Sequence, residues 1–571
     1  MKQKIFALFL ILCGLCLNLK AETQGDVVGR VLDDSGAPLA GATVQILHAK
    51  GGVITDKDGY FRIPYSKDGA VRVKVSFVGY QTQTFVLKAD ERKGEQHVLR
   101  LQPDATALDQ VVVTATRTPK ALKDAPVVTR LITANDIKIA DATNVQDLLT
   151  EQMPGLEFGY AMNQETSLNM NGFGGNAVLF LVDGERLAGE TMDNVDYNRL
   201  NLDNVGRIEI VKGAASALYG ANAVAGVINI ISRENSEPWT ANVNTRYNNF
   251  NKEWRHGGSF SFNAGKWNSQ TSIQRITSDE VQLTSPFDTE SNILHIYGGE
   301  TFNVKERLTY KLSDKVKLIG RGGYFARVSN RGNYDDHYKD YSAGLKTVMN
   351  LSENDNLEIS YGFDQYDKTR FVNNERTHDH DYTNRQNIIR ALYSHIFGKN
   401  TLTAGADFLN DFLTTYQFAN NGSKTQNSYD AFAQFDYNPL QWLNIVASLR
   451  HDYFSASSQH ATTGRLALMT KWKGFSIRAN YAGGFRAPTL KEMYMNFDMA
   501  GMQMIYGNPD LKPEKSNNFN LALEHTGRVK NAGFLTGQYS LTLMGYYNKY
   551  DKRITTEDYA DYTPGTGQPD V

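Results

Sequence analysis

Residues 204–232 limit the fold more than any other segment, because two strand-like stretches enclose a short run of small side chains. Residues 207–211 alternate polar and apolar side chains, and residues 224–231 are almost wholly apolar and rich in β-branched side chains. These patterns predict a half-buried strand followed by a fully buried one. Three glycines, Gly213, Gly220 and Gly226, allow tight turns and close approach of the backbone in this segment.

This stretch resembles the C-terminal half of the plug domain of TonB-dependent outer-membrane receptors. Residues 179–186 are similar to the family's strand and turn with a Val-Asp-Gly element, and residues 144–149, followed by Pro154 and Gly155, resemble the plug's opening helix. The resemblance implies a plug over residues 125–233 that sits inside a transmembrane barrel and closes it. An ordinary small α/β core is the alternative interpretation of the same residues.

Composition is compatible with a transmembrane barrel and does not require one. The net charge of −2 gives no indication of nucleic acid as a partner. Mean hydropathy is −0.44, and beyond the N-terminus no apolar run is long enough for a membrane helix. Barrels hide apolar residues by alternation, and the 30 tyrosines and 48 glycines suit that pattern. A large soluble β protein would contain similar numbers of tyrosine and glycine residues.

The region from 239 to 571 changes in character and predicts an antiparallel transmembrane β-barrel. Residues 356–364, 475–481 and 538–547 alternate polar with apolar side chains, so one face suits lipid and the other a wet lumen. About fifteen such segments have the length of a tilted membrane-crossing strand. Long polar segments, such as 278–299 and 329–339, are expected to be extracellular loops, and short ones periplasmic turns.

The C-terminus departs from the family pattern, because residues 560–571 are polar and turn-like. The resemblance implies about 22 strands, ending on a strand with a terminal aromatic residue. An open sheet edge in lipid leaves backbone groups unpaired. We therefore expect a C-terminally truncated barrel that lacks about seven strands of the full set.

Residues 1–21 predict a secretory signal peptide, with two lysines before an apolar core and Ala21 at the cleavage position. The only cysteines, Cys13 and Cys16, lie inside this segment. A lipoprotein signal is the alternative, although a leucine precedes each cysteine. Cleavage at Ala21 would leave no cysteine in the mature chain, which would exclude disulfides, thiol catalysis and cysteine-bound metals.

Residues 25–103 predict a small β-sandwich of short alternating strands joined by polar turns. The segment resembles the carboxypeptidase regulatory-like domain, which carries no catalytic residues. One interpretation of Asp56 and Asp58 is that they bind calcium. An Asp-Lys-Asp-Gly sequence, however, more often stabilises a turn.

Residues 109–118 resemble a TonB box, the segment that a periplasmic energy-transducing partner binds. The expected mechanism is β-augmentation, in which main-chain hydrogen bonds add an extended peptide to a sheet edge. A first plug strand or a linker is the alternative. The residues assigned to partner binding are Asp109, Val111, Val112, Val113, Thr114 and Ala115.

Residues 484–488 and 508–514 resemble the FRAP and NPDL boxes of haem and other TonB-dependent receptors. Arg486 is interpreted either as the partner of an acidic ligand group or as a loop support. The segment between the boxes lacks the histidine that haem receptors typically place there, and is rich in methionine. Methionine ligates haem iron or lines an apolar groove. The ligand candidates here are Tyr494, Met499, Met502, Met504 and Tyr506, beside Met493 and Met495.

Histidines on predicted outer loops are further ligand candidates. His378 and His380, near Glu375 and Asp381, and His337, in a tyrosine- and aspartate-rich segment, have the chemistry to bind a metal or haem. Acidic, solvated loops also contain histidine without such a role. His395 and His451 occupy barrel-strand positions and are expected to be structural.

The combined prediction is a mostly β protein with an N-terminal sandwich, an α/β plug and a partial barrel. The resemblance implies active import of an iron complex, haem ahead of a siderophore, with cobalamin as the alternative and glycan import less favoured. The expected partners are a TonB-type transducer, outer-membrane lipid and a surface lipoprotein. No catalytic motif, resident metal or cofactor is expected. A surface adhesin or structural barrel is the hypothesis from another class.

Overall fold

The computed structural model describes residues 25–33, 36, 38–47, 52–65, 70–77, 82–87, 97–101 and 111–556, without 161–163, 190–193, 236, 284–293, 379–380, 420–421, 499–503 and 530–536. Several predicted features lie outside these residues: the signal peptide with Cys13 and Cys16, Asp109, His380, Met499 and Met502. The described contacts divide the chain into two compact units, residues 1–110 and 111–571.

The first unit contains two small sheets that enclose an apolar core. One sheet has the order β4 (Tyr60–Tyr65), β1 (Gly25–Leu32), β7 (His97–Arg100). The other has the order β3 (Gly52–Ile54), β2 (Thr43–Ile46), β5 (Val71–Ser76), β6 (Gln83–Leu87). Alternate residues of these strands, including Val27, Val44 and Val73, are fully buried, as period-two alternation requires.

The Asp-Lys-Asp-Gly sequence forms a turn before β4, in agreement with the turn interpretation. Asp56 Oδ1 accepts hydrogen bonds from the backbone N–H groups of Asp58 and Tyr60, at 3.0 and 2.8 Å. A side-chain oxygen that satisfies the turn's own backbone is typical Asx-turn chemistry.

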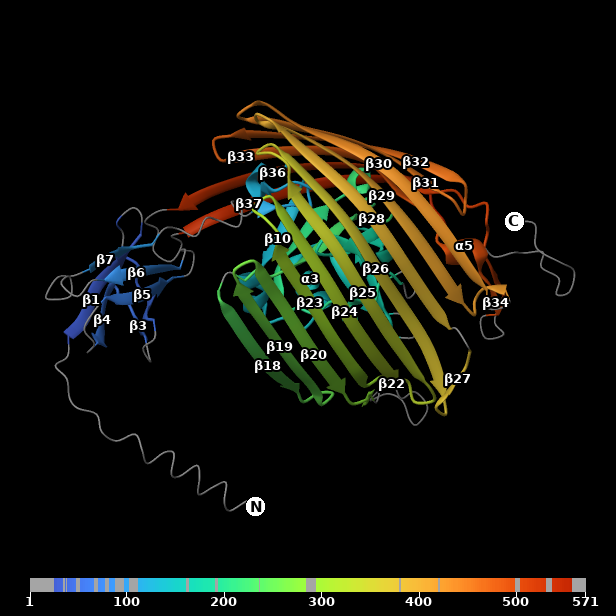
Figure 1. The fold of residues 1–571 in the computed structure, drawn as a ribbon, viewed down its shortest axis with the longest axis horizontal. Helices are drawn as coiled ribbons and strands as arrows, with labels where there is room; N and C mark the ends of the chain where they lie inside the picture. Colours follow the sequence, from blue (N-terminus) through green and yellow to red (C-terminus); the bar gives the residue numbers. More distant parts are fainter. Residues whose placement is uncertain are drawn as a thin grey trace, which may run out of the picture. The chain divides into compact units, whose positions relative to one another are not determined.

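The plug is built on a five-stranded mixed sheet (Figure 1). Its order is β10 (Thr129–Thr133), β16 (Val205–Lys212), β17 (Gly226–Ser232), β14 (Val178–Val182), β15 (Glu185–Arg186). Strands β16 and β17 are antiparallel and confirm the two strands predicted within residues 204–232. A second sheet contains β11 (Leu156–Tyr160), β12 (Thr166–Met170) and β13 (Phe173–Gly174).

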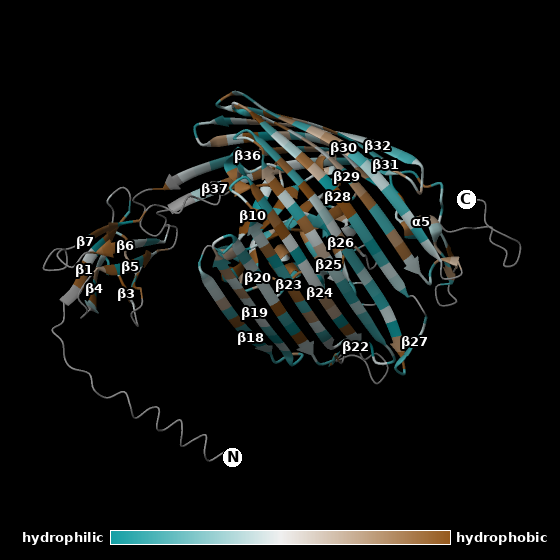
Figure 2. Cartoon of the chain, viewed as in Figure 1, coloured by the Kyte–Doolittle hydropathy of each residue, from teal (hydrophilic) through white to brown (hydrophobic). Residues whose placement is uncertain are grey.

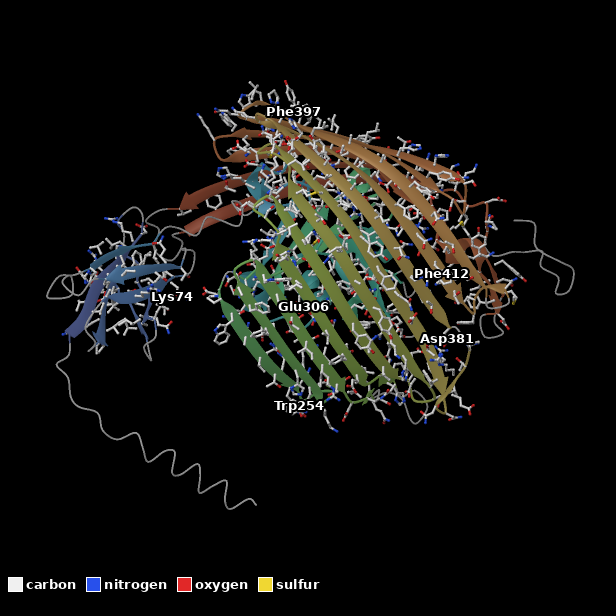
Figure 3. The ribbon with its side chains drawn as sticks, in the orientation of Figure 1. Lys74, Trp254, Glu306, Asp381, Phe397 and Phe412 are labelled. Atoms are coloured by element: carbon white, nitrogen blue, oxygen red, sulfur yellow. The ribbon has the colours of Figure 1, made fainter. Side chains whose placement is uncertain are left out.

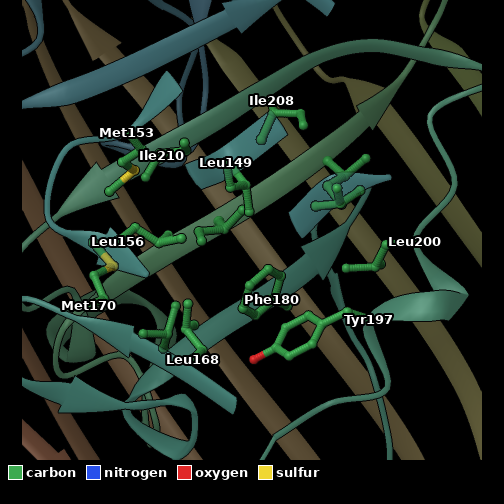
Figure 4. Close-up of a cluster of buried hydrophobic side chains, with 14 of the residues drawn as sticks. Leu149, Met153, Leu156, Leu168, Met170, Phe180, Tyr197, Leu200, Ile208 and Ile210 are labelled. Atoms are coloured by element: carbon green, nitrogen blue, oxygen red, sulfur yellow. The ribbon is translucent and has the colours of Figure 1, made fainter. Parts of the chain in front are cut away.

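Short helices cover the plug sheet and complete its core. Helix α2 (Ala134–Ala140) begins with a capping box formed by Thr133 and Asp136, and α3 (Val145–Gln152) begins at the side-chain cap of Asn144. Figure 4 shows the buried cluster that α3 helps to form with the sheets. The remaining helical turns are η3 (Leu122–Asp124), η4 (Gly175–Ala177), η5 (Tyr197–Arg199) and α4 (Ser216–Tyr219).

Fifteen antiparallel strands follow one another along the chain and form the curved wall around the plug (Figure 1). They are β18 (Trp239–Asn248), β19 (Glu253–Ala264), β20 (Trp267–Ser278), β23 (Gly299–Lys311), β24 (Val316–Asn330), β25 (Asp335–Asn350), β26 (Asp355–Val372), β28 (Tyr382–Phe397), β29 (Asn400–Thr415), β30 (Ser423–Leu440), β31 (Leu443–Phe454), β32 (Gln459–Trp472), β33 (Phe475–Arg486), β36 (Glu514–Val529) and β37 (Gly537–Lys552). The expectation of further strands beyond Val571 stays a prediction.

Side chains alternate across this wall, which Figure 2 shows as polar and apolar residues alternating along each strand. Aromatic residues lie on the outer face near both ends of the strands, such as Trp254 and Phe397 in Figure 3. This is the arrangement of a barrel that meets lipid on its outside. Within the residues that the structure describes, no helix is long and apolar enough to cross a membrane.

Short elements occupy the loops at the end of the wall where the long connections lie. They are the hairpins β21 (Val281–Leu283)–β22 (Leu294–Ile296) and β34 (Asn496–Asp498)–β35 (Met504–Tyr506), strand β27 (Glu375–Arg376) on β26, and helix α5 (Leu490–Tyr494). Strands β8 (Val111–Val112) and β9 (Lys120–Ala121) pair before the plug sheet begins.

Candidate functional site: the plug, its coupling segment and the outer mouth

The plug is fastened to the barrel wall by buried ion pairs. Plug residue Arg199 donates to Asp340 and Asp364 of the wall at 2.6 and 2.8 Å. Wall residue Arg327 donates to plug residue Asp196 at 2.9 Å. Burial alone would raise the pKa of Asp196, but Arg327 and hydrogen bonds hold it below its ordinary value. Each pair keeps a buried charge compensated, so breaking one is costly.

A cavity of about 120 Å³ with charged, polar and apolar lining residues lies between the plug and strands β20 to β28. Six buried polar atoms of its lining residues have no hydrogen-bond partner among the described residues: Glu185 Oε1 and Oε2, Arg199 Nε, Asn201 Nδ2, Gln270 Oε1 and Asn303 Oδ1. A cavity of this size with several donors and acceptors is suited to ordered water. The plug therefore meets this part of the wall through ion pairs, unlike its own apolar core.

Residues 111–116 of the predicted TonB box are folded onto the plug. The backbone N–H groups of Val113 and Thr114 donate to Glu209 Oε2 at 2.9 and 2.8 Å, and Thr114 Oγ1 donates to the same oxygen at 2.7 Å. Tyr219 donates to the Thr114 carbonyl at 3.0 Å. Val112, Thr114 and Ala115 are buried, whereas Val111 is half-exposed. In this arrangement the segment is not an available sheet edge, so partner binding requires its release from Glu209.

The outer mouth brings three loops together through stacked rings. His378 stacks on Tyr416 with ring centroids 4.5 Å apart, and Tyr416 meets Phe497 edge-on at 6.2 Å. His378 Nδ1 lies 2.8 Å from Oδ1 of Asp381, which is labelled in Figure 3. Burial raises the pKa of Tyr416. This places His378 beside the methionine-rich loop, which contributes Phe497.

The hairpin of the methionine-rich loop presents two different faces. Met504 and Tyr506 are 40% and 38% exposed, whereas Phe497 and Ile505 lie on the opposite, more buried face. The structure therefore does not bring Met504 to the His378 stack. Tyr494, at the end of α5, meets Phe418 edge-on at 6.5 Å and has Lys424 Nζ 4.5 Å from its ring centroid.

Arg486 has the geometry of a loop support. It is 2% exposed, and its guanidinium donates to Glu492 at 2.8 Å and Glu514 at 2.9 Å. Glu492 also caps α5 through Thr489. The two boxes that carry Arg486 and Glu514 are thus joined by an ion pair, which fits the loop-support interpretation, and a ligand role for Arg486 stays a prediction.

His337, His395 and His451 face the outside of the wall. His337 lies on β25 next to Asp336, which is buried on the lumen side and bonded to Arg370, so His337 points the other way. Its ring lies 4.5 Å from Phe371. His395 bonds to Asp355, and His451 lies 3.2 Å from His460 on the outer face. These positions separate His337 from the mouth.

Three family models match the chain. The one described as "TonB dependent receptor-like, beta-barrel" matches residues 284–569. Those described as "TonB-dependent Receptor Plug Domain" and "CarboxypepD_reg-like domain" match residues 121–227 and 27–113. The chain therefore belongs to the TonB-dependent receptors, a family of outer-membrane transporters that work with periplasmic TonB and bind small ligands.

Individual relatives carry different substrates in their names. The iron-regulated outer membrane virulence protein of Vibrio cholerae is 25% identical over 482 residues, covering 79% of this chain and 70% of the relative. The vitamin B12 transporter BtuB of Vibrio cholerae is 27% identical, covering 81% and 74%. The siderophore receptor PirA from Pseudomonas aeruginosa has a TM-score of 0.61 at 17% identity, covering 77% of both chains, which shows a shared fold.

Sequence reasoning missed the residues that connect distant segments. Glu209 lies in a predicted strand, but nothing in the sequence indicates that it accepts hydrogen bonds from residues 113 and 114. Tyr416 lies in a loop without a recognisable motif, and Phe497 lies in the methionine-rich segment but is not among its candidate residues. Arg199 follows a segment with no predicted role, and only the fold places it between Asp340 and Asp364.

Proposed function

We propose that this receptor imports an anionic iron complex, haem or a ferric siderophore, across the outer membrane. The single observation that carries this proposal is the outer mouth, where His378 stacks on Tyr416 and Phe497 meets Tyr416 edge-on. Lys424 beside Tyr494, and Arg370 4.0 Å from the Tyr334 ring centroid, add cations. Flat rings and cations together suit a conjugated, negatively charged ligand.

Energy coupling in this proposal acts through residues 109–118. A TonB-type partner binds these residues by β-augmentation after Glu209 releases the backbone of Val113 and Thr114. Pulling on this segment transmits force to the plug, because Tyr219 and Asn229 of the plug are bonded to Thr114. The ion-pair contact with β20 to β28 is the surface that separates.

A hemin titration followed at the Soret band tests the substrate. We expect a saturable shift that weakens about tenfold in Tyr416→Ala, because stacking on one ring is lost. His451→Ala, on the outer face, is the matched control and should bind like the parent. Replacing Met499, Met502 and Met504 together by leucine tests ligation by the methionine-rich loop. An unshifted band in the parent would discard haem and leave ferric siderophores as the iron complex.

Cobalamin is the second candidate, and the BtuB relative at 27% identity favours it. Binding of radiolabelled cyanocobalamin that hemin does not displace, with no hemin shift, would support this candidate over iron.

The N-terminal unit is proposed to be a non-catalytic accessory domain of the receptor, and a surface lipoprotein stays a proposed partner. The domain limits that we propose are 25–103, 109–118, 125–233 and 239–571.

A further inference from the structure

The carboxylate of Glu306, on β23, lies on the outer face of the barrel, where lipid is expected. On β23 the side chains of Asn303 and Lys305 bond to the plug carbonyl of Arg199, at 3.0 and 3.1 Å, so these positions face the lumen. Alternation along a strand then turns Glu306 to the outside. Figure 3 labels Glu306 on this wall.

Hydroxyl groups of the neighbouring strand hold Glu306 in place. Ser269 Oγ donates to Glu306 Oε1 at 2.7 Å, and Thr271 Oγ1 donates to Oε2. Both residues are on the outer face of β20, because Gln274 on the same strand bonds to Asp203 of the plug and so faces inward. Two strands therefore build one polar patch on the outer surface.

The patch lies within the apolar band of the wall. On β23, Glu306 stands between Leu308 and Val304, and beyond them between Tyr310 and Phe302. Tyr310 packs against Trp267 at 4.3 Å, next to the short turns. Four residues separate Tyr310 from Glu306, about 13 Å along the strand, or about 9 Å of depth at a tilt of about 45°.

A hollow lies beside the patch on the next strand. Gly322 on β24 pairs with Glu306, and Gly320 pairs with Leu308. A Cβ atom added at either glycine would meet nothing within 4 Å. The outer surface is therefore open along this line, with Leu308 on one side and Leu345, which pairs with Gly320, on the other.

The Glu306 carboxylate can accept more hydrogen bonds than its two hydroxyl neighbours donate. A carboxylate accepts about four hydrogen bonds, and the two hydroxyls supply only part of this capacity. An ionisable group that faces hydrocarbon is costly and is by default a functional site with a partner. The partner must supply N–H or O–H groups below the aromatic belt, where a lipid headgroup amine does not lie.

We propose that Glu306, Ser269 and Thr271 bind a membrane lipid that carries N–H or O–H donors just beneath its headgroup, such as an amide-linked acyl chain with a nearby hydroxyl. The donors bond to the Glu306 carboxylate, and an acyl chain lies in the hollow at Gly320 and Gly322. The depth of the carboxylate and the narrow apolar hollow favour a lipid over a cationic segment of another protein.

Sphingomyelin and phosphatidylcholine test this site, because they share a headgroup and differ in the amide and hydroxyl below it. Native mass spectrometry of the whole receptor, delipidated from mixed micelles of the two lipids, measures which lipid is retained. We expect the parent to retain sphingomyelin about tenfold better, as for a hydrogen bond to a charged acceptor. Glu306→Met should abolish this preference and Glu306→Gln should reduce it.

Two further variants separate the site from general effects. Glu300→Gln, also on the outer face but paired with Arg275 at 2.7 Å, is the matched control and should keep the preference. Gly322→Leu, which fills the hollow and keeps the carboxylate, should weaken retention. Ser269→Ala with Thr271→Val replaces the Glu306 variants if these fail to fold, and should also reduce the preference.

Equal retention of both lipids by the parent would overturn the proposal, as would a preference that survives in Glu306→Met. Retention governed by the headgroup, with phosphatidylethanolamine preferred over both choline lipids, would also overturn it. A copurifying protein that leaves on Glu306→Met substitution would assign the patch to a protein partner instead.

Discussion

At the residue scale, the coupling segment depends on one carboxylate. Glu209 is fully buried and accepts three hydrogen bonds from Val113 and Thr114 through a single oxygen. Charge-assisted hydrogen bonds of this kind are stronger than neutral ones. Glu209 thereby sets how readily residues 111–116 leave the plug.

Replacing Glu209 by alanine should expose the coupling segment. Losing charge-assisted bonds worth about 1.5–3 kcal/mol should raise the population of the released segment tenfold or more. The rate of maleimide labelling of a cysteine placed at Val113 measures this release. Glu234→Ala, which removes a carboxylate that is 72% exposed in its side chain, is the control. Equal labelling rates in both variants would contradict the role of Glu209.

Replacing Arg199 by methionine should loosen the plug, because Asp340 and Asp364 are left buried without their cation. The expected loss is about 3–5 kcal/mol of unfolding free energy. Denaturant unfolding of the purified receptor measures it. Lys252→Met, at an exposed pair with Asp279, should cost at most about 1 kcal/mol. A loss at Arg199 no larger than this would show that the plug is held elsewhere.

Residue types were more predictable than their partners. The motif around Arg486 indicates a ligand or loop-support role, but it does not indicate the ion pair with Glu514, 28 residues away in the chain. Period-two alternation indicates which way a side chain faces and says nothing about which distant group it meets. His337 illustrates this limit, since its chemistry suits a ligand but its strand position turns it outward.

At the element scale, strands β16, β17 and the barrel wall follow from local pattern, because alternation and β-branched residues are local signals. The structure of the outer loops does not follow from local pattern. Helix α5 lies inside the predicted methionine-rich loop, where its signature is a capping box of Thr489 and Glu492. The hairpin β34–β35 sends Phe497 and Met504 to opposite faces, and this separation needs the pairing of Asp498 with Met504.

Thr489→Ala should loosen α5 and the support of the mouth. Loss of an N-cap costs about 1 kcal/mol, because the backbone N–H of Glu492 loses its acceptor, Thr489 Oγ1. Hydrogen exchange of residues 490–495 should speed up about fivefold. Thr425→Ala, a loop-end residue of β30 without this cap role, is the comparison. Unchanged exchange would show that α5 is fixed by packing of Leu490 and Met493 alone.

At the scale of the whole molecule, the family was predictable, because plug and barrel each have a sequence signature. The signal peptide and the domain limits stay predictions. The substrate was not predictable, because it depends on loops that meet only in the folded mouth. The chain spans 70–74% of the length of the relatives described above. Its first 110 residues form a unit with a core of their own.

The central claim is that this receptor takes up its ligand only when a TonB-type partner pulls on the coupling segment. Uptake of iron from hemin or a ferric siderophore should be measured in cells carrying the parent receptor or one lacking residues 109–116. The account predicts that the deletion keeps surface binding and loses uptake, as does dissipating the proton gradient in the parent. Uptake that survives both treatments would contradict the account, and surface binding by a parent that imports no ligand would favour an adhesin.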